Sequence, residues 1–377
     1  MSTPPTHHVV AHSTPLRSTH LFNPTLVHLH PATELPNQPL AQSVKWSSRR
    51  ARKARYAPRI HHIHNPELPI SLDAKHKLGT AVIRAASVES KLKPHLDADV
   101  SFWIAVLFTL GSVVWVVNGF LVLLPIYRSS LNAVSYYRAA AATAFLGGTI
   151  FEVGSYLMVV EALNRGRETN FGSSLYSFVH SKADSELHQK HRRSMSEKTV
   201  SPDGVEEAGD ERWLDDTTSE KKFVWWGKGL WHDIGYDAAY IQLWAATVFW
   251  VATITGLPGV IKGFPDNPSV AITDVFYWTP QVVGGSGFML SAILLMLEVQ
   301  TRWWKPALSD IGWHIGFWNL VGAVGFMICG AFGYSPLERW VTQSGLSTFW
   351  GSWAFLIGSG MQLYEVIWRE PTDKKTA

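Results

Sequence analysis

The residues best able to do chemistry are polar side chains inside long apolar segments. Glu152 stands in an otherwise uncharged run, nine residues before Glu161, which is about 13 Å along a helix. A carboxylate at that depth in a bilayer is costly and often marks an ion or proton pathway. Two interpretations stay open: a protonated Glu152 that links helices through a hydrogen bond, or a titrating group of a transporter. The other polar residues within such runs are Asn319, His314 and Asn118.

A second feature is a carboxylate followed four residues later by arginine, and it occurs three times. The pairs are Glu161 with Arg165, Glu298 with Arg302, and Glu365 with Arg369. Residues four apart lie on one helix face, so each pair predicts a salt bridge at the membrane interface that ends a helix. The alternative is a charged ring at the cytosolic mouth of a central pathway.

Each pair closes a longer pattern, Gly-x3-Phe-x2-[Gly/Ser]-x6-Glu-x3-Arg. At 100° per residue these positions share one narrow helix face, which predicts a packing stripe. Small residues on such a stripe let helices approach closely in lipid. The stripe residues are Gly147, Phe151, Gly154, Gly284, Phe288, Ser291, Gly351, Phe355 and Gly358.

The residue inventory argues against an enzyme. The only cysteine, Cys329, lies in an apolar run, so neither a disulfide framework nor a cysteine metal site can form. No nucleophile elbow, HExxH motif or glycine-rich nucleotide loop is present. We therefore expect no catalytic residue, no cofactor, no bound metal and no nucleic-acid partner.

The elements that must position these residues are apolar helices. The chain is 46% hydrophobic and 17% charged over 377 residues, yet its charges avoid six runs long enough to cross a bilayer. We predict an all-α membrane protein whose six transmembrane helices form three pseudo-repeated hairpins. The predicted spans are 101–126, 139–163, 238–261, 275–297, 311–337 and 341–364.

Two further predictions concern the orientation of the protein in the membrane and the alignment of its first, third and fifth spans. Thirteen Lys and Arg flank one side and four the other, which predicts that both termini are cytosolic, in the plasma membrane or an endomembrane. Aligning the odd spans on Trp103, Trp244 and Trp318 gives Asn319 only apolar counterparts, Ile104 and Ala245.

The polar segments are predicted to be disordered and cytosolic. Residues 1–96 carry a basic cluster, Lys45 to Arg59, which predicts contact with anionic lipid, and residues 71–93 could form a surface helix. The loop 166–236 holds two candidate phosphorylation sites, Ser194 and Ser196. The hairpins occupy 97–165, 237–302 and 303–369, and a short tail follows at 370–377.

Three segments carry a family resemblance: FLGGTIFEVGSYLMVVEALNR, VVGGSGFMLSAILLMLEVQTR and FWGSWAFLIGSGMQLYEVIWR. They resemble the YrhK-like membrane domain, a bacterial hairpin unit, and multi-span fungal integral membrane proteins with similar units. The resemblance implies the hairpin architecture and no activity. The function predicted is a non-enzymatic membrane scaffold or regulated adaptor; the alternative is a proton-linked or ion or small-solute transporter centred on Glu152.

Overall fold

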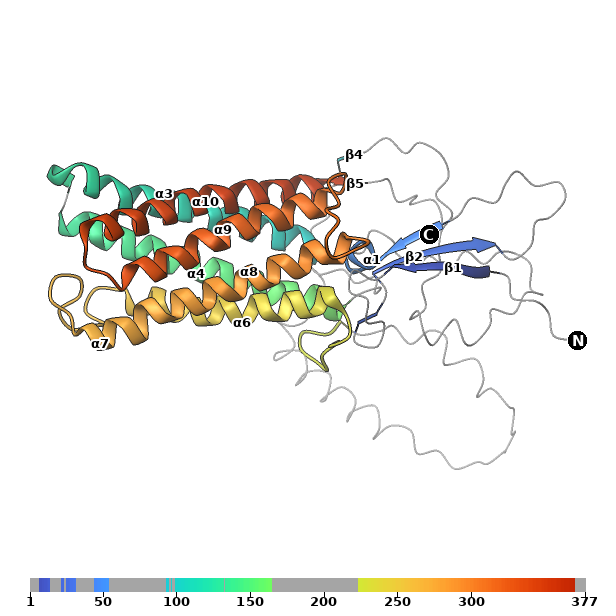
Figure 1. Cartoon of the computed structure of the whole chain (residues 1–377), viewed down its shortest axis with the longest axis horizontal. Coiled ribbons are helices and arrows are strands. Elements are labelled where there is room, and N and C mark those ends of the chain that lie inside the picture. The colour runs from blue at the N-terminus through green and yellow to red at the C-terminus, as the bar shows by residue number, and fades with distance from the viewer. Residues whose placement is uncertain are drawn as a thin grey trace, which may run out of the picture.

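Six long helices lie side by side in a closed ring (Figure 1). The computed structural model describes residues 7–13, 22–23, 25–31, 44–53, 93–94, 96, 99–131, 133–164 and 223–369. Each long helix contacts the next along the chain, and the last contacts the first. The long helices are α3 (Val100–Tyr127), α4 (Val134–Leu163), α6 (Ile234–Thr255), α8 (Thr279–Val299), α9 (Ile311–Gly333) and α10 (Glu338–Ile367).

Smaller elements gather mainly at the end of the ring where α4, α8 and α10 finish (Figure 1). There, β1 (His7–Ser13), β2 (Leu26–Pro31) and β3 (Val44–Ser47) form an antiparallel sheet that leads directly into the short helix α1 (Ser48–Arg52). The strands β4 (Lys93–Pro94) and β5 (Trp368–Arg369) pair beside it. The opposite end carries η1 (Ser129–Leu131), α7 (Val270–Thr273) and η2 (Asp274–Trp278), a π-helical turn before α8.

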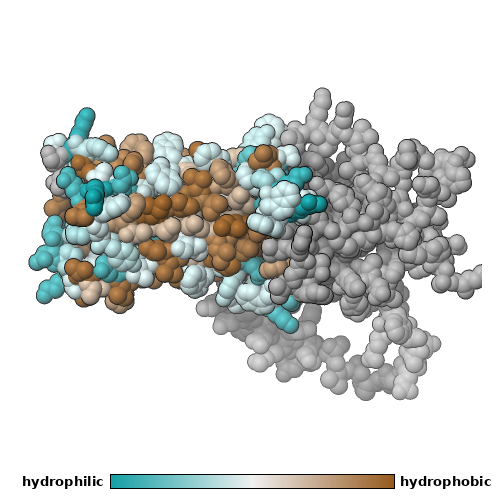
Figure 2. Space-filling model, viewed as in Figure 1, coloured by the Kyte–Doolittle hydropathy of each residue, from teal (hydrophilic) through white to brown (hydrophobic). Residues whose placement is uncertain are grey.

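Length and composition make five of these helices long and apolar enough to cross a membrane: α3, α4, α6, the stretch Val270–Val299 that ends in α8, and α9. Their outer faces expose residues such as Val113, Leu146 and Leu290, and Figure 2 shows apolar residues over the middle of the bundle on the face in view. Apolar side chains that face outward over such a belt suit lipid. The prediction of an all-helical membrane domain is confirmed at this level.

The observed helix ends differ from the predicted spans where backbone chemistry stops a helix. The third span ends at Thr255 rather than Ile261, because Gly256 and Pro258 follow it. The fifth ends at Gly333, three residues before Pro336. The N-terminal segment is not disordered throughout, since β1, β2, β3 and α1 lie in it, whereas most of residues 54–98 and all of 165–222 lie outside the described residues.

The first, third and fifth of the long helices share an N-cap residue that the alignment on tryptophans did not use. Asp99, Asp233 and Asp310 are the N-caps of α3, α6 and α9, and each carboxylate accepts a backbone N–H of the first turn. Counted from these caps, Asn319 stands nine residues into α9, where α6 has Gln242 and α3 has Phe108. Trp103, Trp244 and Trp318 stand 4, 11 and 8 residues after these caps, so aligning them put the helices out of register, and the predicted counterparts of Asn319 were wrong.

The stripe residues all point into the protein. All nine are buried, and a side-chain carbon added to Gly147, Gly284 or Gly351 would lie within 3.1 Å of a neighbouring helix. The three stripe phenylalanines belong to one hydrophobic core together with Trp115 of α3. The stripe is thus the inner face of α4, α8 and α10.

Candidate functional site

The three repeated glutamates meet at one end of the ring. Glu161, Glu298 and Glu365 lie in the last turns of α4, α8 and α10 and are at most 6% exposed. Among the described residues, no group of three histidine, cysteine or acidic side chains is placed to share a metal ion. The carboxylates converge instead on the basic side chains of α1.

Arg52 joins two of the three carboxylates. Its guanidinium donates to Glu161 and to Glu298, each at 2.7 Å between nitrogen and oxygen. A guanidinium has donors along two edges, so one arginine can hold two carboxylates that come from different helices. Two serine hydroxyls complete this half of the site: Ser48 donates to Glu298 at 3.1 Å, and Ser101 donates to Glu161.

The third carboxylate, Glu365, pairs with two more basic side chains, those of Arg49 and Lys53. Arg49 donates to Glu365 at 2.8 Å, and the Lys53 ammonium lies 3.3 Å from the same oxygen. Arg49, Arg52 and Lys53 are each at most 5% exposed. Among the described side chains, three buried cations therefore face three buried carboxylates, and we call this cluster the charged cap.

Glycines at the starts of α6 and α9 make room for the charged cap. A side-chain carbon at Gly235 would lie 2.5 Å from a Glu298 oxygen and 2.8 Å from Nε of Arg52, and one at Gly312 would lie 2.5 Å from Nε of Arg49. Both glycines stand two residues after a capping aspartate, and the same position in α3 is Ser101. The helix starts are thus shaped to admit the arginines.

The arginines remain charged in this buried place. Burial works against the guanidinium charge of Arg52, but Glu298 and Glu161 outweigh it, so the pKa of Arg52 lies above its ordinary value. Burial also opposes the charge of Arg49, and Glu365 is the main group that raises the pKa of Arg49 in spite of it. Arg49 and Arg52 therefore stay charged over the ordinary pH range.

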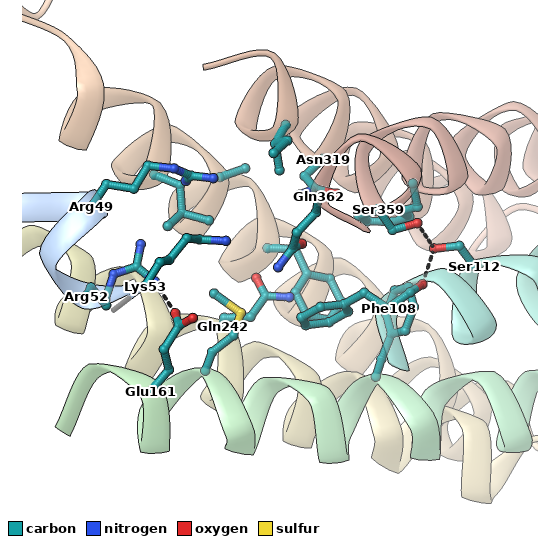
Figure 3. Close-up of a pocket in the computed structure, with 17 residues that line it drawn as sticks. Arg49, Arg52, Lys53, Phe108, Ser112, Glu161, Gln242, Asn319, Ser359 and Gln362 are labelled. Atoms are coloured by element: carbon teal, nitrogen blue, oxygen red, sulfur yellow. Dashed lines mark hydrogen bonds and ion pairs between the residues drawn. The ribbon is translucent and has the colours of Figure 1, made fainter. Parts of the chain in front are cut away.

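Beneath the charged cap lies a cavity on the axis of the ring (Figure 3). Its wall takes side chains from all six long helices and its roof is formed by α1. The polar part of the wall consists of amides and hydroxyls from four helices. These are Ser112 on α3, Gln242 on α6, Asn319 on α9, and Ser359 and Gln362 on α10.

Aromatic rings fill the axis beyond the cavity. Phe151, Phe288 and Phe355 line its inner end. Next to them, Trp115, Phe249 and Phe326 stand sixteen residues after the three capping aspartates and form a triangle with ring centres 4.8 to 5.9 Å apart. The space between these two layers has an almost wholly apolar lining. The polar cavity is thus continuous with the charged cap and is closed by rings on its other side.

Glu152 does not belong to this cavity. Its carboxylate accepts a hydrogen bond from Thr247 of α6 at 2.8 Å, on the outer side of the α4–α6 contact. The cavity lining contains Asn319 but not Glu152 or His314. A Glu152 that titrates in a transport pathway should border a polar cavity with Asn319 or His314, and it does not border this one; its contact with Thr247 is that of a link between helices.

The other predicted polar residues make local links. Asn118 donates to the Ala140 carbonyl and to Thr143, which joins α3 to α4. The ring of His314 lies 2.8 Å from the Leu308 carbonyl in the loop before α9. Of the predicted polar residues in the spans, Asn319 alone lines the axial cavity.

Of the three salt bridges predicted within a helix, the described side chains test only Glu298 with Arg302, and that pair does not form. Glu298 pairs with Arg52, while Arg302 lies beyond the end of α8 and places its guanidinium over the Trp304 ring. A helix that stops at Val299 cannot hold residues 298 and 302 in the spacing of one turn. The side chains of Arg165 and Arg369 lie outside the described residues, as do Ser194 and Ser196.

Part of the basic segment predicted to bind lipid is buried in ion pairs within the protein. Arg49, Arg52 and Lys53 belong to the charged cap, while residues 54–59 lie outside the described residues. Sequence reasoning missed this role and missed Gln242 and Gln362. The equal spacing of Gln242 and Asn319 from their capping aspartates could have identified these two residues. Nothing in the sequence indicates that Arg49, Arg52 and Lys53 pair with the glutamates.

No protein-family model, curated protein or solved structure matches the chain.

Proposed function

We propose that the protein has six membrane spans arranged as three related hairpins, with both termini on the cytosolic side. The sixth span is α10, which is 30 residues long, packs between α9 and α3 and exposes Trp353 and Ile357. Its serines and glycines lower its mean hydropathy, and many of them face inward. The shared spacings of caps, rings and glutamates support the hairpin repeat and the resemblance to YrhK-like units.

We further propose that the protein transports a small polar solute or ion along the axis of the ring. The observation that carries this proposal is the polar cavity, because the amides of Gln242, Asn319 and Gln362 converge on it from three helices inside an apolar bundle, where polar groups need hydrogen-bond partners. The pathway is centred on Gln242, Asn319 and Gln362 rather than on Glu152.

Uptake into vesicles tests the transport proposal. Purified protein in liposomes is assayed for entry of K⁺ and of glycerol, in the natural chain and in the Arg52→Gln variant, since Arg52 lies across the mouth. Asn319→Leu should abolish entry because a branched apolar side chain replaces an amide in the cavity wall. Glu152→Gln, outside the cavity, is the matched control and should transport normally. Rates equal to those of empty liposomes for all chains would refute transport of these probes.

One observation favours the adaptor role as a second candidate. Asn164 at the end of α4 donates to the Val224 carbonyl at 2.7 Å and accepts from the Val224 N–H at 2.8 Å. These bonds join the two chain positions that flank residues 165–222, as expected for a module displayed from a membrane anchor. Replacing 165–222 with a short linker should leave transport and detergent stability unchanged if the loop serves only a partner.

A further inference from the structure

The segment that closes the mouth of the cavity is held by charge. α1 has only five residues, too few for its own hydrogen bonds to maintain a helix in water. Its buried side chains lie against carboxylates more than 100 positions away in the chain. The position of α1 therefore depends on its contact with the ends of α4, α8 and α10, together with its link to β3 and the hydrogen bond from the Ser48 N–H to the Thr25 carbonyl.

We propose that α1 is a removable plug, an internal cationic ligand that occupies the three-glutamate mouth and covers the axial cavity from the cytosolic end. This inference rests on the transport function proposed above. In Figure 3, Arg49, Arg52 and Lys53 lie at one end of the cavity and Ser112 and Ser359 at the other. A solute that reaches the amides from this end must pass the three cations.

The energetics of buried ion pairs suit a contact that can open. Each partner loses its hydration when α1 docks, and the attraction between the charges offsets much of that loss without a large surplus. When α1 leaves, both the basic side chains and the glutamates regain water. The free-energy difference between the docked and the undocked state of α1 is therefore small, and a competing polyanion or a change in ionic strength can shift it.

The departure of α1 also defines the class of solute. Its departure removes the cations of Arg49, Arg52 and Lys53 from Glu161, Glu298 and Glu365, so the mouth above the neutral polar cavity becomes more negative. Rings of acidic side chains attract cations and repel anions. The open state should therefore admit small cations.

Cysteine labelling tests the plug without relying on transport. In full-length protein that carries Cys329→Ser, Ser359→Cys places a single reporter thiol in the cavity wall. In liposomes with the cytosolic side accessible, Arg49→Gln, Arg52→Gln and Lys53→Gln together should raise the rate of labelling by a small impermeant cationic thiol reagent at least tenfold. An anionic reagent of similar size should gain less. Lys75→Gln, Lys77→Gln and Arg84→Gln change the net charge equally and should leave both rates unchanged.

A second version avoids variants that fail to fold. A protease site inserted between residues 60 and 90 is cleaved after reconstitution, and the liposomes are washed in high salt to remove the cut segment. The cationic labelling rate should again rise at least tenfold. An unchanged rate, with the segment shown to be gone, would overturn the plug. Faster labelling without K⁺ entry would support the plug and refute transport of K⁺.

Discussion

At the residue scale, four membrane glutamates fall into two groups. Glu161, Glu298 and Glu365 pair with buried cations. Glu152 is half-buried and accepts a hydrogen bond from the Thr247 hydroxyl. A carboxylate with a full countercharge depends on that partner for stability, whereas one that needs only a hydrogen bond can be replaced by an amide. The two groups should therefore respond differently to the same substitution.

Glu298→Gln should lower the unfolding free energy in detergent by about 3 kcal/mol, because the remaining Arg52 charge stays buried with half of its compensation. Glu152→Gln keeps an acceptor for Thr247 and should change the unfolding free energy by less than about 1 kcal/mol. Denaturant titration of tryptophan fluorescence measures both. Equal losses would show that Glu298 is not the more strongly coupled residue.

A double-mutant cycle isolates the Arg52 contact. The losses of stability in Arg52→Gln and Glu161→Gln should sum to more than the loss in the double variant, by about 1–3 kcal/mol, since each single change strands a buried charge. Arg302→Gln combined with Glu161→Gln is the control, because Arg302 lies over Trp304, and these two losses should add. Additivity in both cycles would argue against the charged cap.

At the element scale, the inner faces of the helices are set by residues without side chains. A carbon at Gly358 of α10 would lie 2.9 Å from the Asn319 amide oxygen, whereas one at Gly360 would have no neighbour within 4 Å. The same helix therefore offers a packed glycine and an open one two positions apart. This pair separates the effect of packing from the helix preference of glycine.

Gly358→Leu should destabilise the protein in detergent by about 1–3 kcal/mol, because the larger side chain pushes α10 away from α9. Gly360→Leu should leave stability unchanged or raise it slightly, since leucine favours helix more than glycine does. Thermal unfolding of the two variants gives the comparison. A loss of similar size in both would remove the close contact of α10 and α9 as its cause.

At the scale of the whole molecule, the six long helices place residues before α3, after α8 and after α10 at one end. Figure 1 shows α1 and β5 at that end and the α3–α4 connection at the other. β4 pairs with β5, so the segments before α3 and after α10 meet. An even number of crossings follows if α10 crosses the membrane as its length allows.

Site-specific labelling tests the crossings. All three tested positions are exposed: Lys305 and Trp368 at one end of the ring and Asn267 at the other. On the Cys329→Ser background, Lys305→Cys and Trp368→Cys should therefore react with an impermeant thiol reagent from one side of the membrane, and Asn267→Cys from the other. The cytosolic side should be that of Lys305, in line with the excess of basic flanks. Labelling of Trp368→Cys from the Asn267 side would mean that α10 does not cross.

Local properties of the sequence determined where the helices lie and which faces turn inward. Apolar length alone required helices in a bilayer, since unpaired backbone groups are too costly there. The pattern that ends in Glu161, Glu298 and Glu365 identified the buried face, because helix periodicity places those positions together whatever the neighbours are. Glu152 stood off that face, and the tertiary structure gives it a partner outside the cavity.

Only the tertiary structure decided what the inward residues meet. The three glutamates pair with Arg49, Arg52 and Lys53, which are far away in the chain and of a type common in solvated tails, so neither spacing nor composition singled them out. Gln242 and Asn319 share a cavity because the helices align on capping aspartates rather than on tryptophans. A local period fixes directions around one helix, whereas the depth of one helix against another and the place of α1 depend on the packing of the whole ring.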